Sequence, residues 1–122
     1  MCLMEMGDAC FLKSKARIHI FNNIRPGVNL SFHCKSKDND LGKQVLGYRG
    51  SYSFHFCPNV FGTTLFFCSF AWEGGQSLWF DIYTGKRDQN CGDCTWNINP
   101  SGPCWVNTAG VLKTQLCYPW KY

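Results

Sequence analysis

The sequence lacks long hydrophobic runs and is poor in charged residues. Its longest apolar stretch, Leu65–Trp72, is interrupted by Ser69 and falls far short of the roughly 20 residues that a membrane-spanning helix requires. Charged residues make up only 16% of the 122 residues, which excludes the charge-dense composition of disordered chains. We therefore expect a folded chain with no membrane insertion, and its length favours a single domain.

The chain also lacks a strong excess of charge of one sign. Its Lys and Arg residues number 12 and its Asp and Glu residues number 8, which gives a net charge of +4. Domains that bind nucleic acids carry a much stronger basic excess, usually concentrated in one patch. We expect no nucleic-acid partner, and the net charge by itself identifies no other partner.

Cysteine, in contrast, is abundant. Nine cysteines in 122 residues approach the density of small secreted chains held together by disulfides, so we expect an oxidising compartment. An odd number leaves at least one thiol unpaired in a monomer, and our candidate is Cys2. Residues 1–11 contain Glu5 and Asp8 where the apolar centre of a signal peptide would lie. We therefore interpret the chain as a mature secreted form whose leader has been removed.

Aromatic side chains, 16% of the chain, favour the half-buried surfaces of β-sheets. Residues 28–34 and 51–56 alternate apolar and polar side chains, the pattern of a strand with one buried face. Residues 63–72 are apolar on both faces, which indicates a central strand. Further strands are predicted at residues 16–21, 44–48, 77–83 and 94–98 and near Trp105.

The spacing of these strands predicts the fold class. They are short, they are separated by turns rich in Gly, Pro and Asn, and no segment has a helical period of useful length. About eight such strands predict an all-β fold, an antiparallel β-sandwich of two sheets stapled by disulfides. We assign residues 1–15 to an N-terminal extension and residues 16–122 to the sandwich domain.

One N-glycosylation acceptor is encoded. Asn29 is followed by Leu30 and Ser31, which gives the N-x-[ST] form, whereas Pro100 blocks the second such triplet at Asn99. The strand alternation places Asn29 on the outward face, where a glycan would be tolerated. Asn29 is therefore our candidate glycosylation site, although such triplets also arise by chance.

Two motifs of metal sites are incomplete. Cys91 and Cys94 have the C-x-x-C spacing of zinc and redox sites, but no second C-x-x-C or His pair completes a zinc tetrahedron, and no βαβ pattern accompanies the motif. Asp38 and Asp40 have the spacing of the first two ligands of an EF-hand calcium loop, but Arg49 occupies the position where the loop requires a bidentate Glu. We expect structural disulfides, no metal and no cofactor.

Histidine and tryptophan side chains are the remaining candidates for catalysis and sugar binding. The histidines lie on predicted outward strand faces and share no motif with a nucleophile or an acid, so we expect no enzyme. Exposed tryptophans can stack on sugars, which keeps a carbohydrate-binding module open as an alternative. The residues concerned are His19, His33, His55, Trp72, Trp79, Trp96, Trp105 and Trp120, of which Trp96 is expected to be buried.

Five segments, in the same order along the chain as in a known family, carry a resemblance to that family. They read FHCKSKDNDLG at 32–42, NVFGTTLFFC at 59–68, WFDIY at 79–83, CTWNI at 94–98 and GPC at 102–104. Together they resemble the plant self-incompatibility S-protein family, also called S-protein homologues, from about Ala16 to Cys104. Asn39 departs from the family, which usually has a third acidic residue at this position before Leu-Gly.

The resemblance implies a small secreted β-sandwich without enzymatic activity. Some members of the family are stigma-secreted ligands of a pollen surface receptor. The family's four shared cysteines correspond to Cys34, Cys68, Cys94 and Cys104, although the resemblance does not supply their pairing. We therefore expect a monomeric plant signalling ligand that binds a cell-surface receptor protein. The alternative is a secreted defence or carbohydrate-binding module.

A disulfide pairing follows if successive strands reverse direction. Cys34 then closes one strand and Cys94 opens another at the same pole of the sandwich, within the roughly 7 Å limit between Cα atoms of a disulfide. The predicted bridges are Cys34–Cys94 and Cys68–Cys104, with Cys57–Cys91 and Cys10–Cys117 as additional pairs.

The same reversal places residues 35–43 and 84–93 side by side at one pole. Both segments are rich in charge, and loops on a rigid sheet are a common location for binding residues. The competing interpretation is that these charges are only solvated. The residues proposed to contact a receptor are Lys37, Asp38, Asp40, Lys43, Lys86, Arg87 and Asp88.

Overall fold

A computed structural model describes residue 10 and residues 15–74, 77–88, 91–107 and 114–120 of the chain. All the secondary-structure elements in this part of the chain are strands, and it contains no helix that could cross a membrane. Their bounds are β1 (Ala16–Asn22), β2 (Leu30–Lys35), β3 (Asp40–Leu46), β4 (Ser51–Phe56), β5 (Leu65–Trp72), β6 (Leu78–Thr84), β7 (Asp93–Asn99), β8 (Gly102–Asn107) and β9 (Thr114–Cys117).

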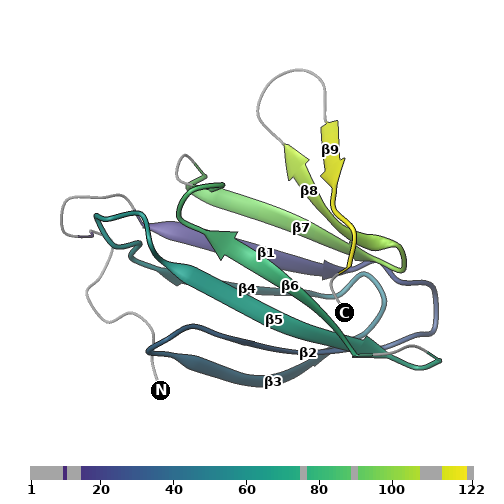
Figure 1. Cartoon of the computed structure of the whole chain (residues 1–122). Coiled ribbons are helices and arrows are strands. Elements are labelled where there is room, and N and C mark those ends of the chain that lie inside the picture. Colours follow the sequence, from purple (N-terminus) through teal and green to yellow (C-terminus); the bar gives the residue numbers. More distant parts are fainter. Residues whose placement is uncertain (1–9, 11–14, 75–76, 89–90, 108–113, 121–122) are drawn as a thin grey trace.

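The strands form two sheets that pack as a sandwich (Figure 1). One sheet has the order β4-β1-β7-β8-β9 and the other the order β3-β2-β5-β6, so the predicted fold class is confirmed. The prediction of a wholly antiparallel fold is wrong at one place, because β1 and β7 pair in parallel. Successive strands alternate in direction along the chain, so two odd-numbered strands run in the same direction. β1 and β7 are both odd-numbered and are neighbours in the sheet, so they pair in parallel.

Two strand predictions also need correction. The ninth strand, β9, was not predicted, and it pairs with β8 at the edge of the five-stranded sheet. β3 begins at Asp40, inside the segment 35–43 that was expected to be a polar loop. Lys43 therefore lies opposite His33 in the ladder between β2 and β3, because pairing with a neighbour recruits polar residues that carry no strand pattern of their own.

The core lies between the sheets and consists largely of rings. The period-two pattern turns Ile18 and Ile20 of β1 inward, where both are completely buried. Phe66 of β5 lies 4.6 Å, centroid to centroid, from the ring of Phe56 on β4, so it joins the two sheets. The loops at each end of the sandwich connect the strands whose side chains form this aromatic layer.

A buried amide closes the crossing from β1 to β2. The Asn22 side chain is completely buried, and its Nδ2 donates to the carbonyl oxygens of Val28 at 2.8 Å and Leu46 at 2.9 Å. Its Oδ1 accepts from the backbone N–H of Ile24 at 3.0 Å. Both N–H donors and the oxygen of this amide have a partner, which is what burial of a polar group requires.

The disulfides differ from the predicted scheme at every bridge. The structure joins Cys10–Cys57, Cys34–Cys68, Cys91–Cys94 and Cys104–Cys117. The predicted pairs Cys34–Cys94, Cys68–Cys104, Cys57–Cys91 and Cys10–Cys117 are therefore all corrected.

The reason for the correction is the strand order. Cys34 and Cys68 face each other in the ladder between β2 and β5, with Cα atoms 4.0 Å apart. Cys104 and Cys117 face each other in the same way between β8 and β9, at 3.9 Å. Close cross-strand pairs of antiparallel ladders bring side chains into this range. Cys94, by contrast, belongs to the other sheet from Cys34.

The N-terminal predictions fall mostly outside the described residues. The strands begin at Ala16, and of the predicted extension, residues 1–15, only Cys10 and Lys15 are described. The candidate free thiol, Cys2, lies outside them. The other eight cysteines of the chain are bridged.

Candidate functional site

Three loops meet at one end of the sandwich, which we call the three-loop end. They are residues 36–39 between β2 and β3, residues 57–64 between β4 and β5, and residues 85–88 after β6. The end of β2, the start of β5 and the end of β6 are neighbours in one sheet, as Lys35 pairs with Phe67 and Leu65 with Thr84. The sheet therefore brings the three loops together.

The middle loop separates the two segments that were expected to be adjacent. We call residues 57–64 the apolar loop and residues 85–88 the charged loop. The backbone N–H of Gly85 donates to the carbonyl oxygen of Thr64 at 2.9 Å, so the charged loop contacts the apolar loop. Residues 35–39 and 84–88 do reach the same end, but they lie on opposite sides of the apolar loop, because β5 lies between β2 and β6.

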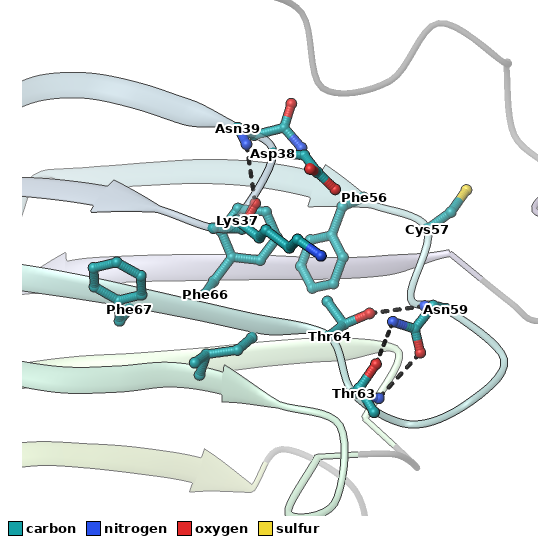
Figure 2. A pocket seen from close by; sticks show the side chains of 12 residues that line it. Lys37, Asp38, Asn39, Phe56, Cys57, Asn59, Thr63, Thr64, Phe66 and Phe67 are labelled. Atoms are coloured by element: carbon teal, nitrogen blue, oxygen red, sulfur yellow. Dashed lines mark hydrogen bonds between the residues drawn. The ribbon is translucent and has the colours of Figure 1, made fainter.

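A cleft of about 570 Å³ lies between residues 36–39 and the apolar loop. Figure 2 shows Lys37 and Asp38 on one side of it and Thr63 and Thr64 on the other, with the ring of Phe56 between them. The cleft is bounded by charged, hydroxyl and aromatic groups, so its lining suits a mixed polar and apolar contact.

The apolar loop is held by the side chain of Asn59. Its Oδ1 accepts from the backbone N–H groups of Phe61 at 3.1 Å and Thr63 at 3.0 Å, and its Nδ2 donates to Thr63 Oγ1 at 2.8 Å (Figure 2). The Asn59 backbone N–H donates to Thr64 Oγ1 at 2.8 Å. Gly62 supplies the left-handed conformation of the turn, with φ of 73°. The loop is thus internally hydrogen-bonded.

The tip of this loop exposes apolar side chains. Phe61 is 83% exposed, the highest value among the large apolar side chains that the structure describes. Val60 is 45% exposed and Leu65, where β5 begins, is 41% exposed. We call these three exposed residues of the three-loop end the apolar patch, and no motif in the sequence marks them.

The charged loop has the opposite arrangement. Asp88 is buried, and its Oδ2 accepts from the backbone N–H of Thr84 at 3.0 Å and from Arg87 Nη2 at 2.7 Å. Nη2 of Arg87 also donates to the carbonyl oxygen of Asp81 at 2.8 Å. Arg87 and Asp88, both proposed as receptor contacts, are therefore directed inward and are used in the fold.

Three aromatic rings surround the guanidinium of Arg87. Its Cζ lies 5.0 Å from the ring centroid of Trp96, 5.2 Å from that of Phe80 and 5.5 Å from that of Tyr118. Phe80 belongs to one sheet and Trp96 to the other, so Arg87 bridges the two sheets. A cation among aromatic faces is stabilised by the ring quadrupoles, and Arg is the usual donor.

The remaining residues of the proposed receptor contact are at the surface. Lys37, Asp38, Lys43 and Lys86 are exposed. Asp40 is exposed too, and its carboxylate contacts His33 Nε2 at 2.5 Å. The hydrogen bond from His33, aided by one from the backbone N–H of Gly42, lowers the pKa of Asp40. Only part of the proposed surface can thus reach another molecule.

The sheet brings a serine, a histidine and an aspartate together. His19 Nδ1 lies 2.6 Å from Ser53 Oγ, and His19 Nε2 contacts the carboxylate of Asp93. No sequence motif marks this group, because the three residues lie on β4, β1 and β7. They lie on the outer side of the sheet, and Asp93 is 67% exposed. A catalytic triad also needs hydrogen-bond donors beside the serine for the developing oxyanion, so these three residues alone do not establish catalysis.

The tryptophans offer a smaller aromatic platform than the sequence suggested. Trp96 is completely buried, as expected, and Trp120 is also buried. Trp72 and Trp105 are half-buried. Trp79 is the exposed one, at 44%, and its ring lies 6.1 Å from that of Phe67 on the outer face of the four-stranded sheet.

Asn29 and the cysteine motif can also be located. Asn29 is exposed, so the acceptor is accessible, while glycosylation itself stays a prediction. Cys91 and Cys94 are joined to each other. No cluster of three or more metal-ligating side chains occurs within the described ranges.

The chain is similar to known plant proteins. A sequence model of the family described as plant self-incompatibility protein S1 matches residues 17–120. S-protein homolog 5 of Arabidopsis thaliana is 44% identical over 108 residues, which cover 88% of this chain and 80% of the relative. S-protein homolog 20 of the same plant is 43% identical over 117 residues, which cover 93% of this chain and 82% of the relative.

A solved structure has a similar fold. It is that of self-incompatibility protein homologues, described as a widespread family of small, highly stable, secreted proteins from plants. Its TM-score is 0.61 at 17% sequence identity, and the similarity covers 88% of this chain and 96% of that one. At this identity the likeness bears on the fold alone.

Proposed function

Because this chain belongs to the plant self-incompatibility protein S1 family, we propose that it is a secreted, non-enzymatic signalling ligand that binds a receptor protein at the plant cell surface. Secretion is supported by the solved homologue, which is described as secreted, and by the bridging of eight of the nine cysteines. Disulfides at this density persist in oxidising compartments.

The observation that carries the binding role is the three-loop end itself. It combines an internally hydrogen-bonded loop, an exposed apolar patch and exposed charges beside a cleft. Interfaces between proteins characteristically surround an apolar centre with a polar rim. A ligand that binds through this end would present a preformed surface, because the sandwich and its bridges hold the loops in place.

Binding to plant protoplasts tests this function. Fluorescently labelled protein should bind them saturably, unlabelled protein should displace it, and brief protease treatment of the protoplasts should abolish the binding. Binding that protease leaves unchanged, or that never saturates, would contradict a receptor protein.

Thiol titration of protein isolated from plant tissue tests the disulfides and should find about one thiol per chain, since nine cysteines and four bridges leave one.

A carbohydrate-binding role is the second candidate, and Trp79 is the observation that favours it. Its exposed ring lies beside Phe67 on the outer face of the four-stranded sheet, an arrangement on which a sugar ring can stack. This candidate predicts that the protein is retained on isolated cell-wall polysaccharide and that Trp79→Ala is not. Equal behaviour of the two proteins on polysaccharide would exclude this surface.

A further inference from the structure

Phe61 is the feature of the three-loop end that folding does not explain. Its ring is 83% exposed although the core of this protein is built from aromatic rings. An apolar side chain stabilises a fold in proportion to the area it removes from water, and Phe61 removes little. Its position at the tip of a loop therefore calls for another use.

The backbone around Phe61 is fixed from several directions. The Asn59 Oδ1 accepts from the N–H groups of both Phe61 and Thr63, so it holds the chain on either side of Gly62. Gly85 lies so close to Gly62 that a Cβ on Gly85 would come within 2.2 Å of the Gly62 carbonyl oxygen. At its start, the loop is tied by the bridge between Cys10 and Cys57. A side chain presented on such a frame loses little backbone freedom when it binds.

The surroundings of Phe61 indicate the chemistry of its partner. Val60 and Leu65 extend the apolar patch. Exposed lysines flank it on both sides, Lys37 from the loop after β2 and Lys86 from the loop after β6, because β5 lies between those strands. An apolar centre between two positive charges is complementary to an apolar pocket with an acidic rim.

This inference rests on the proposed function and names the contact within it. We infer that Phe61 is the anchor of the receptor interface and that it enters an apolar pocket, bordered by acidic side chains, on a partner protein. Lys37 and Lys86 orient the approach to that rim. An anionic membrane is a weaker match, because firm membrane attachment needs a larger basic cluster or a second apolar anchor, whereas this patch has two lysines and a neighbouring acid, Asp38.

The protoplast assay tests the anchor directly. Phe61→Ala should raise the half-saturating concentration about 30-fold, the loss typical of an interface hot spot. Phe61→Trp, which keeps an aromatic anchor, should recover most of the binding. Val45→Ala is the matched control, because it removes another exposed apolar side chain near the last residue of β3, whereas the three-loop end lies before the first residue of β3. Phe61→Ala should leave the melting temperature unchanged, since its ring is exposed.

The charge part of the inference has its own measurement. Lys37→Glu with Lys86→Glu should slow association, with a smaller effect on dissociation, and the difference should shrink as salt is raised. Phe61→Ala should instead speed dissociation at every salt concentration.

The outcomes separate the two proposals. If the unaltered protein shows no saturable, protease-sensitive binding, the proposed function fails and the inference fails with it. If it binds and Phe61→Ala binds within about threefold as well, the inference alone is overturned, because a hot spot costs far more. Phe61-dependent binding to vesicles containing about 30% phosphatidylserine, combined with protease-insensitive binding to protoplasts, would replace the protein partner with a membrane.

Discussion

The apolar loop and the charged loop are neighbours at one end of the sandwich, yet they treat their side chains in opposite ways. The charged loop buries Asp88 and encloses Arg87 among three rings, whereas the apolar loop exposes Phe61 almost fully. Composition would suggest the reverse, with the charges in water and the ring in the core. The difference shows that hydrogen-bond and ring contacts within the fold, more than polarity, decide which side chains are buried here.

Each arrangement has a physical reason. Asp88 can be buried because Arg87 and the backbone of Thr84 satisfy its oxygens. Phe61 can be exposed because Asn59 satisfies the loop's backbone without any help from the ring. The charged loop is therefore part of the structural frame, and the apolar loop is the part available to a partner.

The largest effect should come from removing the cation of the charged loop. Arg87→Ala leaves Asp88 buried without its counter-charge and empties the space between the rings of Phe80 and Trp96. Breaking such a pair costs about 3 kcal/mol of the free energy of unfolding after allowance for the partial exposure of Arg87. Chemical denaturation with intact disulfides measures this. Lys86→Ala, one residue earlier and exposed, should change the value by less than about 0.5 kcal/mol. Equal effects of the two variants would mean that Arg87 is only a solvated charge.

A smaller effect should follow from disturbing the contact between the loops. Gly85→Ala places a Cβ 2.2 Å from the carbonyl oxygen of Gly62, so one of the two backbones must move. We expect a loss of about 2 kcal/mol, as for overpacking elsewhere, and altered amide shifts at Phe61 in NMR spectra. Gly92→Ala is the control, because no atom outside the chain neighbours of Gly92 lies within 4 Å of its added Cβ. If Phe61 kept its shift in the Gly85 variant, the two loops would be independent.

The support of the apolar loop can be tested next. Asn59→Ala removes the acceptor shared by the N–H groups of Phe61 and Thr63, and should cost about 1–2 kcal/mol. The specific readout is amide hydrogen exchange, which should accelerate at these two residues before the core strands respond. Asn59→Asp, which keeps the oxygen acceptor, should retain much of the protection. Unchanged exchange in Asn59→Ala would show that the loop is ordered by other contacts.

The smallest effect is confined to alkaline pH and tests the interior beneath the charged loop. Burial, with a contribution from the negative charge of Asp88, raises the pKa of Tyr83 above its ordinary value of about 10. Unfolded protein therefore releases this proton more readily than folded protein does. The associated stability is complete below about pH 10 and is lost as the pH rises toward the folded pKa.

The variant that isolates this group is Tyr83→Phe. Between about pH 9 and pH 11 its free energy of unfolding should fall less steeply than that of the unaltered protein. Tyr52, whose pKa is also raised by burial, accounts for part of the remaining decline, so Tyr52→Phe is an informative second variant. Parallel curves for Tyr83→Phe and the unaltered protein would show that Tyr83 is not held away from water.

Much of the fold was predictable because strand pattern is local. The alternation of β4 was visible in Ser51–Phe56, and its prediction needed no correction. Polar β3 was only partly visible, since Asp40 and Lys43 are ordered by pairing with β2. The site was less predictable. The resemblance indicated the family, and the reversal of strands indicated that the two charged segments reach one end, but the apolar loop between them was overlooked.

The sequence by itself determined most of the strands and the buried face of those with a clear alternation, because the side-chain period of an extended chain depends only on nearby residues. Only the tertiary structure decided which strands are neighbours, and with that order came the partners of Cys34 and Cys104, the burial of Asn22 and the opposite orientations of Arg87 and Phe61. These depend on contacts between residues far apart in the chain. Their free energies are those of packing and of satisfied buried polar groups, and they exist only once two sheets have met.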